Sequence, residues 1–233
     1  MALITEGKVK SVYDVFNDED KVHIRFHDKV TAGNGRTIDY PEDKGKVCCL
    51  ISTFLFEIIK KHGIPTHFLG TDGSNTMVCK KVNIIPLEVV VRNIAAGSIV
   101  RQTTIEEGTE FKWPLIEFFL KDDEKDDPLL TTDRIIQMGY DMEVVGEMEI
   151  MAREVNSLLK ETFDSIGLTL VDFKLEFGYD SRQNILLADE LSPDGMRLWK
   201  EGKSFDKDLF RKGQGDIVEA YKYILEQLKN NGH

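Results

Sequence analysis

Hydrophobic residues recur at intervals of three and four in three parts of the chain, which is the period of an amphipathic helix. The first stripe predicts a helix over 47–59, ended by the sequence HGIP at 62–65. The second predicts a helix over 144–163 that ends at Gly167. The third predicts a C-terminal helix, whose apolar positions are Ile217, Tyr221, Ile224 and Leu228.

Shorter apolar runs predict strands, since their spacing is closer to a period of two. Strands are expected over 4–15 and 21–26, around a turn at NDED, and over 76–86 and 87–93, with Pro86 at their junction. The stretch between 93 and 144 is expected to be rich in loops. The order of the expected elements is a set of strands with one helix, followed by a second helix, a hairpin and a third helix. This order favours an α+β fold in two lobes, 1–85 and 86–233.

One strand pattern carries charge on alternate positions. In VDFKLEF (171–177) the apolar residues share one face, and Asp172, Lys174 and Glu176 share the other. The next run, ILLADE (185–190), ends in Asp189 and Glu190, and the turn-forming residues GYDSRQN between the runs predict a hairpin. Such a hairpin presents a lysine surrounded by acids. This pattern alone fits either a solvated outer face or a site.

Composition limits the classes of function. The 233 residues are 41% hydrophobic, and no apolar run approaches the ~18–20 residues of a membrane span. The N-terminus lacks the hydrophobic stretch of a signal peptide, and three cysteines form neither a disulfide framework nor a CxxC pattern, which favours a cytoplasmic location. A net charge of −11 argues against binding to nucleic acid or anionic membranes. A phosphate ligand would therefore need a few well-placed cations.

Several common catalytic motifs do not occur in the sequence. It has no GxSxG elbow, no HExxH and no GxxxxGK[ST] phosphate loop. Five scattered histidines form no helical pair, so none is expected to be catalytic, and GNG at 33–35 is typical of a turn. The segment KDDEKDDP (121–128) is, by composition, a solvated surface loop.

Charged residues instead gather near the ends of the expected elements. Lys8 and Lys10 in EGKVK alternate on one strand face, which suits a polyphosphate and equally an exposed strand. Arg92 follows a run of valines and precedes a Gly-Ser turn, a pattern that suits a phosphate group or an ordinary strand end. In DELSPDGMRLW (189–199), carboxylates near Arg197 suit Mg²⁺ shared with a phosphorylated ligand.

Five segments together are similar to one family. The segments GKVKSVY, VVVRNIAAGSIVR, LVDFKLEFG, DELSPDGMRLW and FDKDLFR resemble, in order, the SAICAR synthetases (phosphoribosylaminoimidazole-succinocarboxamide synthases) of purine biosynthesis. The resemblance implies an N-terminal antiparallel-sheet lobe and a second α+β lobe, with ATP in the cleft between them. It also implies joining of L-aspartate to the carboxylate of 5-amino-1-(5-phosphoribosyl)imidazole-4-carboxylate (carboxyaminoimidazole ribonucleotide), through an acyl phosphate, with ATP and Mg²⁺. A homo-oligomer is expected, with a dimer favoured.

The resemblance also implies roles for the nucleotide and metal. Lys8 and Lys10 would lie over the ATP phosphates. The backbone of CKKVN (79–83), including Lys80 and Val82, would bind adenine. The metal would be held by Glu176 and Asp189.

Further roles concern the reacting groups. Lys174 would contact the transferring phosphate, and Arg92, Ser98 and Arg197 would bind the ribonucleotide 5′-phosphate. Acids near the ribonucleotide would be Asp172, counted with the catalytic residues, and Asp194. Lys121 and Asp127, also counted as catalytic, lie in a segment that resembles one closing on substrate.

Two positions depart from the family pattern. Met196 stands where a small hydroxyl residue is often found, and TAGNG (31–35), with Asn34, differs from a serine- and aspartate-containing segment that is a candidate for aspartate recognition. Two other classes of function share the same charged groups. A small-molecule kinase would transfer phosphate to a hydroxyl without aspartate, and a nucleotide sensor would bind ATP without forming a product.

Overall fold

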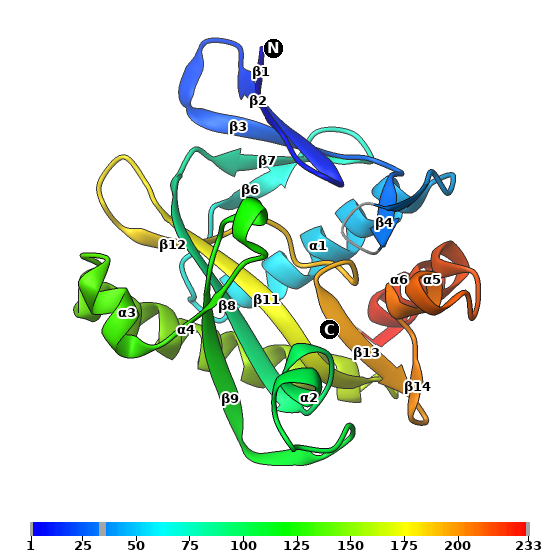
Figure 1. Cartoon of the computed structure of the whole chain (residues 1–233). Coiled ribbons are helices and arrows are strands. Elements are labelled where there is room, and N and C mark those ends of the chain that lie inside the picture. Colours follow the sequence, from blue (N-terminus) through cyan, green and yellow to red (C-terminus); the bar gives the residue numbers. More distant parts are fainter. Residues whose placement is uncertain (1, 33–35, 232–233) are drawn as a thin grey trace.

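Two antiparallel sheets form the framework of the chain, of which the computed structural model describes residues 2–32 and 36–231 (Figure 1). The first sheet has the strand order β1-β2-β3-β7-β6. Its strands are β1 (Leu3–Glu6), β2 (Lys10–Val15), β3 (Asp18–Phe26), β6 (Phe68–Thr71) and β7 (Thr76–Lys80). A separate small hairpin is formed by β4 (Val30–Ala32) and β5 (Thr37–Asp39).

The second sheet has the order β10-β9-β8-β11-β13-β14, and β12 also pairs with β11. Its strands are β8 (Asn83–Ile94), β9 (Glu110–Leu120), β10 (Leu129–Leu130), β11 (Thr169–Tyr179), β12 (Ile185–Ala188), β13 (Met196–Lys200) and β14 (Lys203–Ser204). The predicted α+β class and the antiparallel N-terminal sheet are confirmed.

Three long helices confirm the three predicted stripes: α1 (Lys44–Lys61), α4 (Met142–Asp164) and α6 (Ile217–Asn231). Their buried residues join those of both sheets in one continuous hydrophobic cluster. The shorter helices are α2 (Ser98–Gln102), α3 (Thr132–Gln137), α5 (Asp208–Lys212) and the 3₁₀ turn η1 (Asp123–Lys125). Within the described residues no helix is both long and apolar enough to span a bilayer.

Several expected strand boundaries were wrong. The segment 4–15 forms two strands, because the Gly7 amide donates to the Lys10 carbonyl at 2.8 Å and closes a turn between β1 and β2. Pro86 lies inside β8, and the break falls at residues 81–82 instead. β8 tolerates the proline because its pairing with β11 is irregular at this point, between Glu176 and Gly178.

The stretch expected to be rich in loops contains a long strand, and further strands follow later in the chain. β9 is an 11-residue strand in the predicted loop-rich middle, and β13 and β14 follow the charged hairpin. β9 was missed because its sequence, EFKWPLIEFFL, contains a proline and has no clean alternation of polar and apolar residues.

The outer edge of β11 is shared by two strands. β12 pairs with residues 176–179 and β13 with residues 169–173, so the chain between β12 and β13 leaves the sheet beside Lys174. The Lys174 amide donates to the Gly195 carbonyl at 3.0 Å at this point. The first half of the chain reaches the same place, because the His67 amide donates to Leu187 of β12 at 2.9 Å. The fold therefore converges on the charged face of β11.

Candidate active site

The charged face of β11 is enclosed by protein. The side chains of Asp172 and Glu176 are only 5% and 2% exposed. Two basic side chains contact each of them: Arg92 and Arg197 contact Asp172, and Lys174 and Lys121 contact Glu176. Buried carboxylates are costly unless they are paired, so this arrangement is not that of an ordinary solvated face. The hairpin itself is confirmed.

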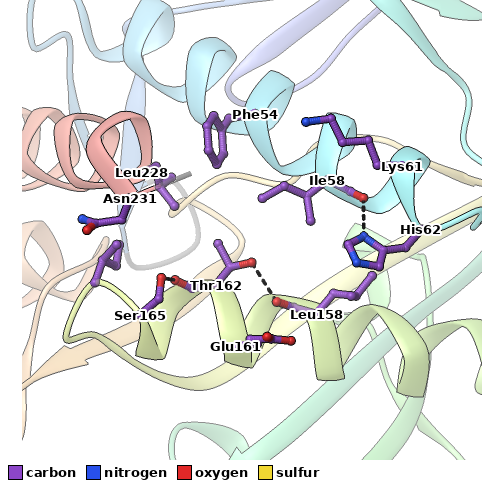
Figure 2. A pocket seen from close by; sticks show the side chains of 11 residues that line it. Phe54, Ile58, Lys61, His62, Leu158, Glu161, Thr162, Ser165, Leu228 and Asn231 are labelled. Atoms are coloured by element: carbon purple, nitrogen blue, oxygen red, sulfur yellow. Dashed lines mark hydrogen bonds between the residues drawn. The ribbon is translucent and has the colours of Figure 1, made fainter. Parts of the chain in front are cut away.

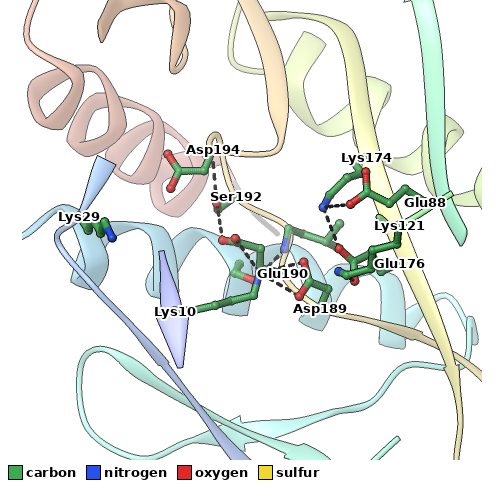
Figure 3. Close-up of polar contacts among 12 residues, drawn as sticks. Lys10, Lys29, Glu88, Lys121, Lys174, Glu176, Asp189, Glu190, Ser192 and Asp194 are labelled. Atoms are coloured by element: carbon green, nitrogen blue, oxygen red, sulfur yellow. Dashed lines mark hydrogen bonds and ion pairs between the residues drawn. The ribbon is translucent and has the colours of Figure 1, made fainter. Parts of the chain in front are cut away.

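Lys174 lies between two glutamates. Its Nζ is 2.7 Å from an oxygen of Glu88 and 2.7 Å from one of Glu176, and Lys121 contacts the other oxygen of Glu176 (Figure 3). The strand register places Glu88 directly opposite Glu176. Burial alone would lower the pKa of Lys174, but Glu176, Asp189 and Glu88 raise it above its ordinary value, so the side chain stays charged.

Lys10 brings the first sheet to the same region. Its Nζ lies 2.8 Å from both oxygens of Asp189 and 2.9 Å from Glu190, which also accepts from Ser192 at 2.7 Å (Figure 3). Burial would raise the pKa of Asp189, but Lys10 and Lys174 hold it below its usual range. The carboxylate is therefore ionised at neutral pH.

Asp189 has a backbone conformation that is unusual for a residue other than glycine. Its φ is 66°, in the left-handed region, and Nε2 of His67 donates to its carbonyl oxygen at 3.0 Å. Burial lowers the pKa of His67 to about 4, so the ring is neutral and can keep this bond at neutral pH. The strained residue is thus fixed from the first half of the chain.

The donor set fits a magnesium ion that shares its coordination with phosphates. Glu176 and Asp189 supply carboxylate oxygens in one charged region, since both interact electrostatically with Lys174. Among the described residues no three His, Cys, Asp or Glu side chains are grouped to hold a metal by themselves. Mg²⁺ is commonly bound by one or two carboxylates together with substrate phosphates, so two are enough.

A second cluster, the arginine cluster, consists of Arg92, Arg197, Asp172, Glu117 and Ser98. Arg92 donates from Nε to Glu117 at 2.6 Å, from Nη1 to Asp172 at 2.8 Å, and from Nη2 to Ser98 at 2.7 Å. Arg197 donates to the same oxygen of Asp172 at 2.7 Å. The structure therefore brings together four of the five residues predicted at the ribonucleotide, all but Asp194, and adds Glu117.

The two arginines differ in what they can still bind. With a further bond to the Ala96 carbonyl, four hydrogen bonds leave Arg92 only one of its five guanidinium N–H donors. The Arg92 side chain is 3% exposed, whereas that of Arg197 is 22% exposed with one short bond to an acid. Gly97 has a φ of 69°, and a Cβ there would lie 2.6 Å from the Arg197 guanidinium, so a larger residue would be strained and would displace this side chain. Arg197 is thus the more available anion donor.

Asp194 belongs to a buried network that sequence reasoning did not anticipate. Lys44, at the start of α1, contacts one oxygen of Asp194 and also donates to the Lys29 carbonyl at 3.2 Å. The Tyr221 hydroxyl donates to the other oxygen of Asp194 at 3.0 Å. Asp194 therefore joins α1 and α6 to the chain after β12, and within the described residues it makes no direct contact with the arginine cluster.

The other predicted residues lie nearby on less enclosed segments. Lys8 is exposed in the β1–β2 turn, and Val82 lies between β7 and β8 against Gly178. The Lys80 amide donates to the His67 carbonyl at 2.7 Å. Asp127 accepts from the Asp122 amide at 2.8 Å and so closes the loop after Lys121.

The two departures from the family pattern have different outcomes. Met196 is buried in β13, where it pairs with Phe173. Asn34 lies outside the described residues.

The partners of the predicted residues that were missed include Glu88, Glu117 and Lys44. They lie 86, 25 and 150 positions from Lys174, Arg92 and Asp194 respectively, and no local pattern links residues so far apart. One signal was available for Glu88. It directly precedes the valine run of β8, so pairing that run with VDFKLEF would have placed it near Glu176.

A separate groove lies between α1, α4 and α6 (Figure 2). It has a volume of about 260 Å³ and contains none of the predicted site residues. Four of its polar side chains bond to nearby backbone carbonyls, as His62 does to Ile58 at 2.9 Å; the others are Thr162, Ser165 and Asn231. The groove therefore offers little of the chemistry of the charged site.

Comparisons with known proteins agree with this geometry. The family model described as SAICAR synthetase matches residues 3–228. A phosphoribosylaminoimidazole-succinocarboxamide synthase of Methanocaldococcus jannaschii is 46% identical over 225 residues, which cover 95% of this chain and 92% of that protein.

Two solved structures superpose with a TM-score of 0.94, and each match covers 98% of both chains. One, 38% identical, is described as a type-2 SAICAR synthetase in complex with ADP. The other, 37% identical, is the phosphoribosylaminoimidazole-succinocarboxamide synthase of Ehrlichia chaffeensis.

Proposed function

Because the chain belongs to the SAICAR synthetase family, and so to the ATP-dependent ligases of purine biosynthesis, we propose that it joins L-aspartate to carboxyaminoimidazole ribonucleotide. The observation that carries this proposal is the pair of clusters along β11. In the arginine cluster, Arg92 and Arg197 both bond to Asp172 of β11. Lys174 lies two residues after Asp172 on the same strand, which separates the two positions by about 7 Å at strand spacing. One ribonucleotide can span them, with its phosphate at one end and its carboxylate at the other.

The reaction requires an activated carboxylate, because a free carboxylate is a poor acceptor for an amine. A carboxylate oxygen first takes the γ-phosphoryl group of ATP, releasing ADP and giving an acyl phosphate. The aspartate amine then attacks the acyl carbon, the bond to the phosphorylated oxygen breaks, and phosphate leaves with that oxygen. No side-chain nucleophile is needed, since catalysis of phosphoryl transfer relies on positioning and charge neutralisation.

The charged residues of the chain supply that neutralisation. Lys10 and Lys174 are held charged by the acids around them and are directed to the phosphate groups in this proposal. Lys8, in the turn before β2, covers the same phosphates. The main chain at Lys80–Val82, where the chain passes from one sheet to the other, binds adenine. The ADP complex of the 38% identical SAICAR synthetase supports a nucleotide site in this chain.

Glu176 and Asp189 would hold Mg²⁺, which when bound supplies positive charge to the phosphates. In the structure these carboxylates bond to Lys174, Lys121 and Lys10, so they are already placed and ionised. Lys121 and Asp127 belong to the loop that we propose closes on the substrate.

At the other end, Arg197 and Ser98 bind the ribonucleotide 5′-phosphate, and Arg92 holds Ser98 and Asp172 in place. Arginine suits this role because its planar donors match phosphate oxygens. Asp172 orients both guanidiniums. Asp194 stabilises the adjacent chain through Lys44 and lies near the ribonucleotide rather than on its phosphate.

The division into lobes 1–85 and 86–233, a homo-oligomeric state with a dimer favoured, and a cytoplasmic location stay predictions. The function is tested by measuring ADP release while ATP, the ribonucleotide and aspartate are omitted in turn. We expect release over many turnovers that requires all three. Release over many turnovers without aspartate would indicate a kinase, and binding of ATP with no product would indicate a sensor.

A further inference from the structure

Lys207, the residue before α5, is a buried lysine without an acidic partner of its own. It is 9% exposed, and within residues 2–32 and 36–231 its ammonium group makes neither a hydrogen bond nor an ion pair. Cations around it are all paired: Lys44 with Asp194, Arg211 with Asp208, and Arg197 with Asp172. The residue is largely buried, but its Nζ is not among the fully buried side-chain atoms that lack a partner, so it keeps some contact with solvent. A largely buried cation without a counter-ion is costly, which points to an anion that reaches it from the solvent.

The acids near Lys207 are already bonded. Asp194 accepts from Lys44 and Tyr221, and Glu190 accepts from Lys10 and Ser192. Burial lowers the pKa of Lys207, and the attraction of Asp194 is opposed by Arg211 and Lys44. Protein carboxylates therefore do not complete this site.

Lys207 is linked to residues at both ends of the proposed active site. Its neighbour in the chain, Asp208, is 3.6 Å from Nε of Arg197 in the arginine cluster. On the other side, Lys207 interacts electrostatically with Glu190, which is bonded to Lys10. An anion on Lys207 would thus lie beside the ribonucleotide, near its reacting end.

We propose that Lys207 binds a carboxylate of the amino-acid substrate, an assignment that rests on the proposed function. The three substrates bring several anionic groups. Arg197 and Ser98 serve the ribonucleotide phosphate, and Lys10, Lys174 and the metal serve the ATP phosphates and the reacting carboxylate. The carboxylates of aspartate are the anions left without a cation. Holding one of them at Lys207 leaves the amine free to attack.

The test is the variant Lys207→Met, which keeps an apolar stem and removes the charge. We expect the KM for aspartate to rise about 10- to 100-fold, as for a lost charge-assisted hydrogen bond. The KM values for ATP and the ribonucleotide should not change, and kcat should be kept at saturating aspartate. Succinate, a dicarboxylate without the amine, should lose potency against aspartate by the same factor. Lys207→Arg should retain part of the aspartate affinity.

The matched control is Lys203→Met, which removes one charge from an exposed lysine of β14 and should leave all constants unchanged. The melting temperature separates binding from structure. Loss of an unpaired buried cation should leave it unchanged or raise it, whereas loss of a structural ion pair would lower it. An unchanged KM for aspartate in Lys207→Met, or a rise confined to the ribonucleotide KM, would overturn the assignment alone. A wild-type enzyme that ignores aspartate would overturn the proposed function and this assignment with it.

Discussion

The substitution Arg92→Lys tests whether the arginine cluster has the energetic role that its geometry suggests. Lysine keeps the charge but cannot reach Glu117, Asp172 and Ser98 together, so at least one buried carboxylate loses a partner. Breaking a buried ion pair costs about 3–5 kcal/mol, and the new ammonium recovers part of this, leaving a loss of about 2–4 kcal/mol. For a chain of this size, the melting temperature should fall by roughly 5–15 °C.

Steady-state kinetics distinguish Arg92 from Arg197. Arg197→Lys affects a partly exposed side chain with one short bond, so we expect about 1 kcal/mol of lost stability and a KM for the ribonucleotide raised about 10- to 100-fold. Arg92→Lys should raise the same KM by about tenfold, through misplacement of Ser98. The KM for ATP should not change in either variant. An unchanged melting temperature in Arg92→Lys, or equal weakening of ATP and ribonucleotide, would refute this reasoning.

Three further predictions concern the rest of the site. Lys174→Met should lower kcat by about 100-fold or more while the protein folds and binds nucleotide, and near-native kcat would reduce Lys174 to a charge-balancing role. Glu176→Gln and Asp189→Asn should each weaken use of Mg²⁺-ATP severely, and the double variant should be little worse than either single variant. Activity is titrated against Mg²⁺, and a wild-type dependence on Mg²⁺ in both single variants would show that neither acid binds the metal. Burial raises the pKa of Asp206 from 3.8 to about 6, so the folded state binds the carboxyl proton more tightly than the unfolded state does. The contribution of Asp206 to the free energy of unfolding should therefore fall by about 3 kcal/mol as the pH rises from about 4 to about 6. Urea unfolding between these pH values should show the slope, and Asp206→Asn should lack it.

The helices and the hairpin could be predicted because their signals are local. The three stripes of α1, α4 and α6 bury one face each, and the alternation in β11 is visible within seven residues. The prediction of β9 failed because its composition suits neither a solvated edge nor a continuous apolar run. The position of Pro86 was misjudged because an irregular pairing with β11, which the sequence of β8 does not show, accommodates it.

The site residues also divide into those that local sequence patterns indicate and those that only the folded chain shows. Arg92, Lys174, Glu176 and Asp189 stand at strand ends and on alternating positions, so sequence patterns could select them. Their neighbours depend on register and on packing between distant segments. The sequence also indicated Arg197 as a candidate phosphate-binding residue. That Arg197 has more guanidinium donors free for an anion than Arg92 follows from hydrogen bonds that only the folded chain forms. The isolation of Lys207 likewise appears only when the partners of every nearby acid are known.

The central claim, that a carboxylate oxygen of the ribonucleotide takes the phosphoryl group and leaves as phosphate, is tested by following the carboxylate oxygens. The ribonucleotide would be labelled with ¹⁸O at both oxygens of its carboxylate, incubated with ATP and aspartate, and the products analysed by mass spectrometry. We expect each released phosphate to carry one labelled oxygen and the amide product to keep the other. Unlabelled phosphate, together with ADP release, would contradict the acyl phosphate and the reaction proposed for this site.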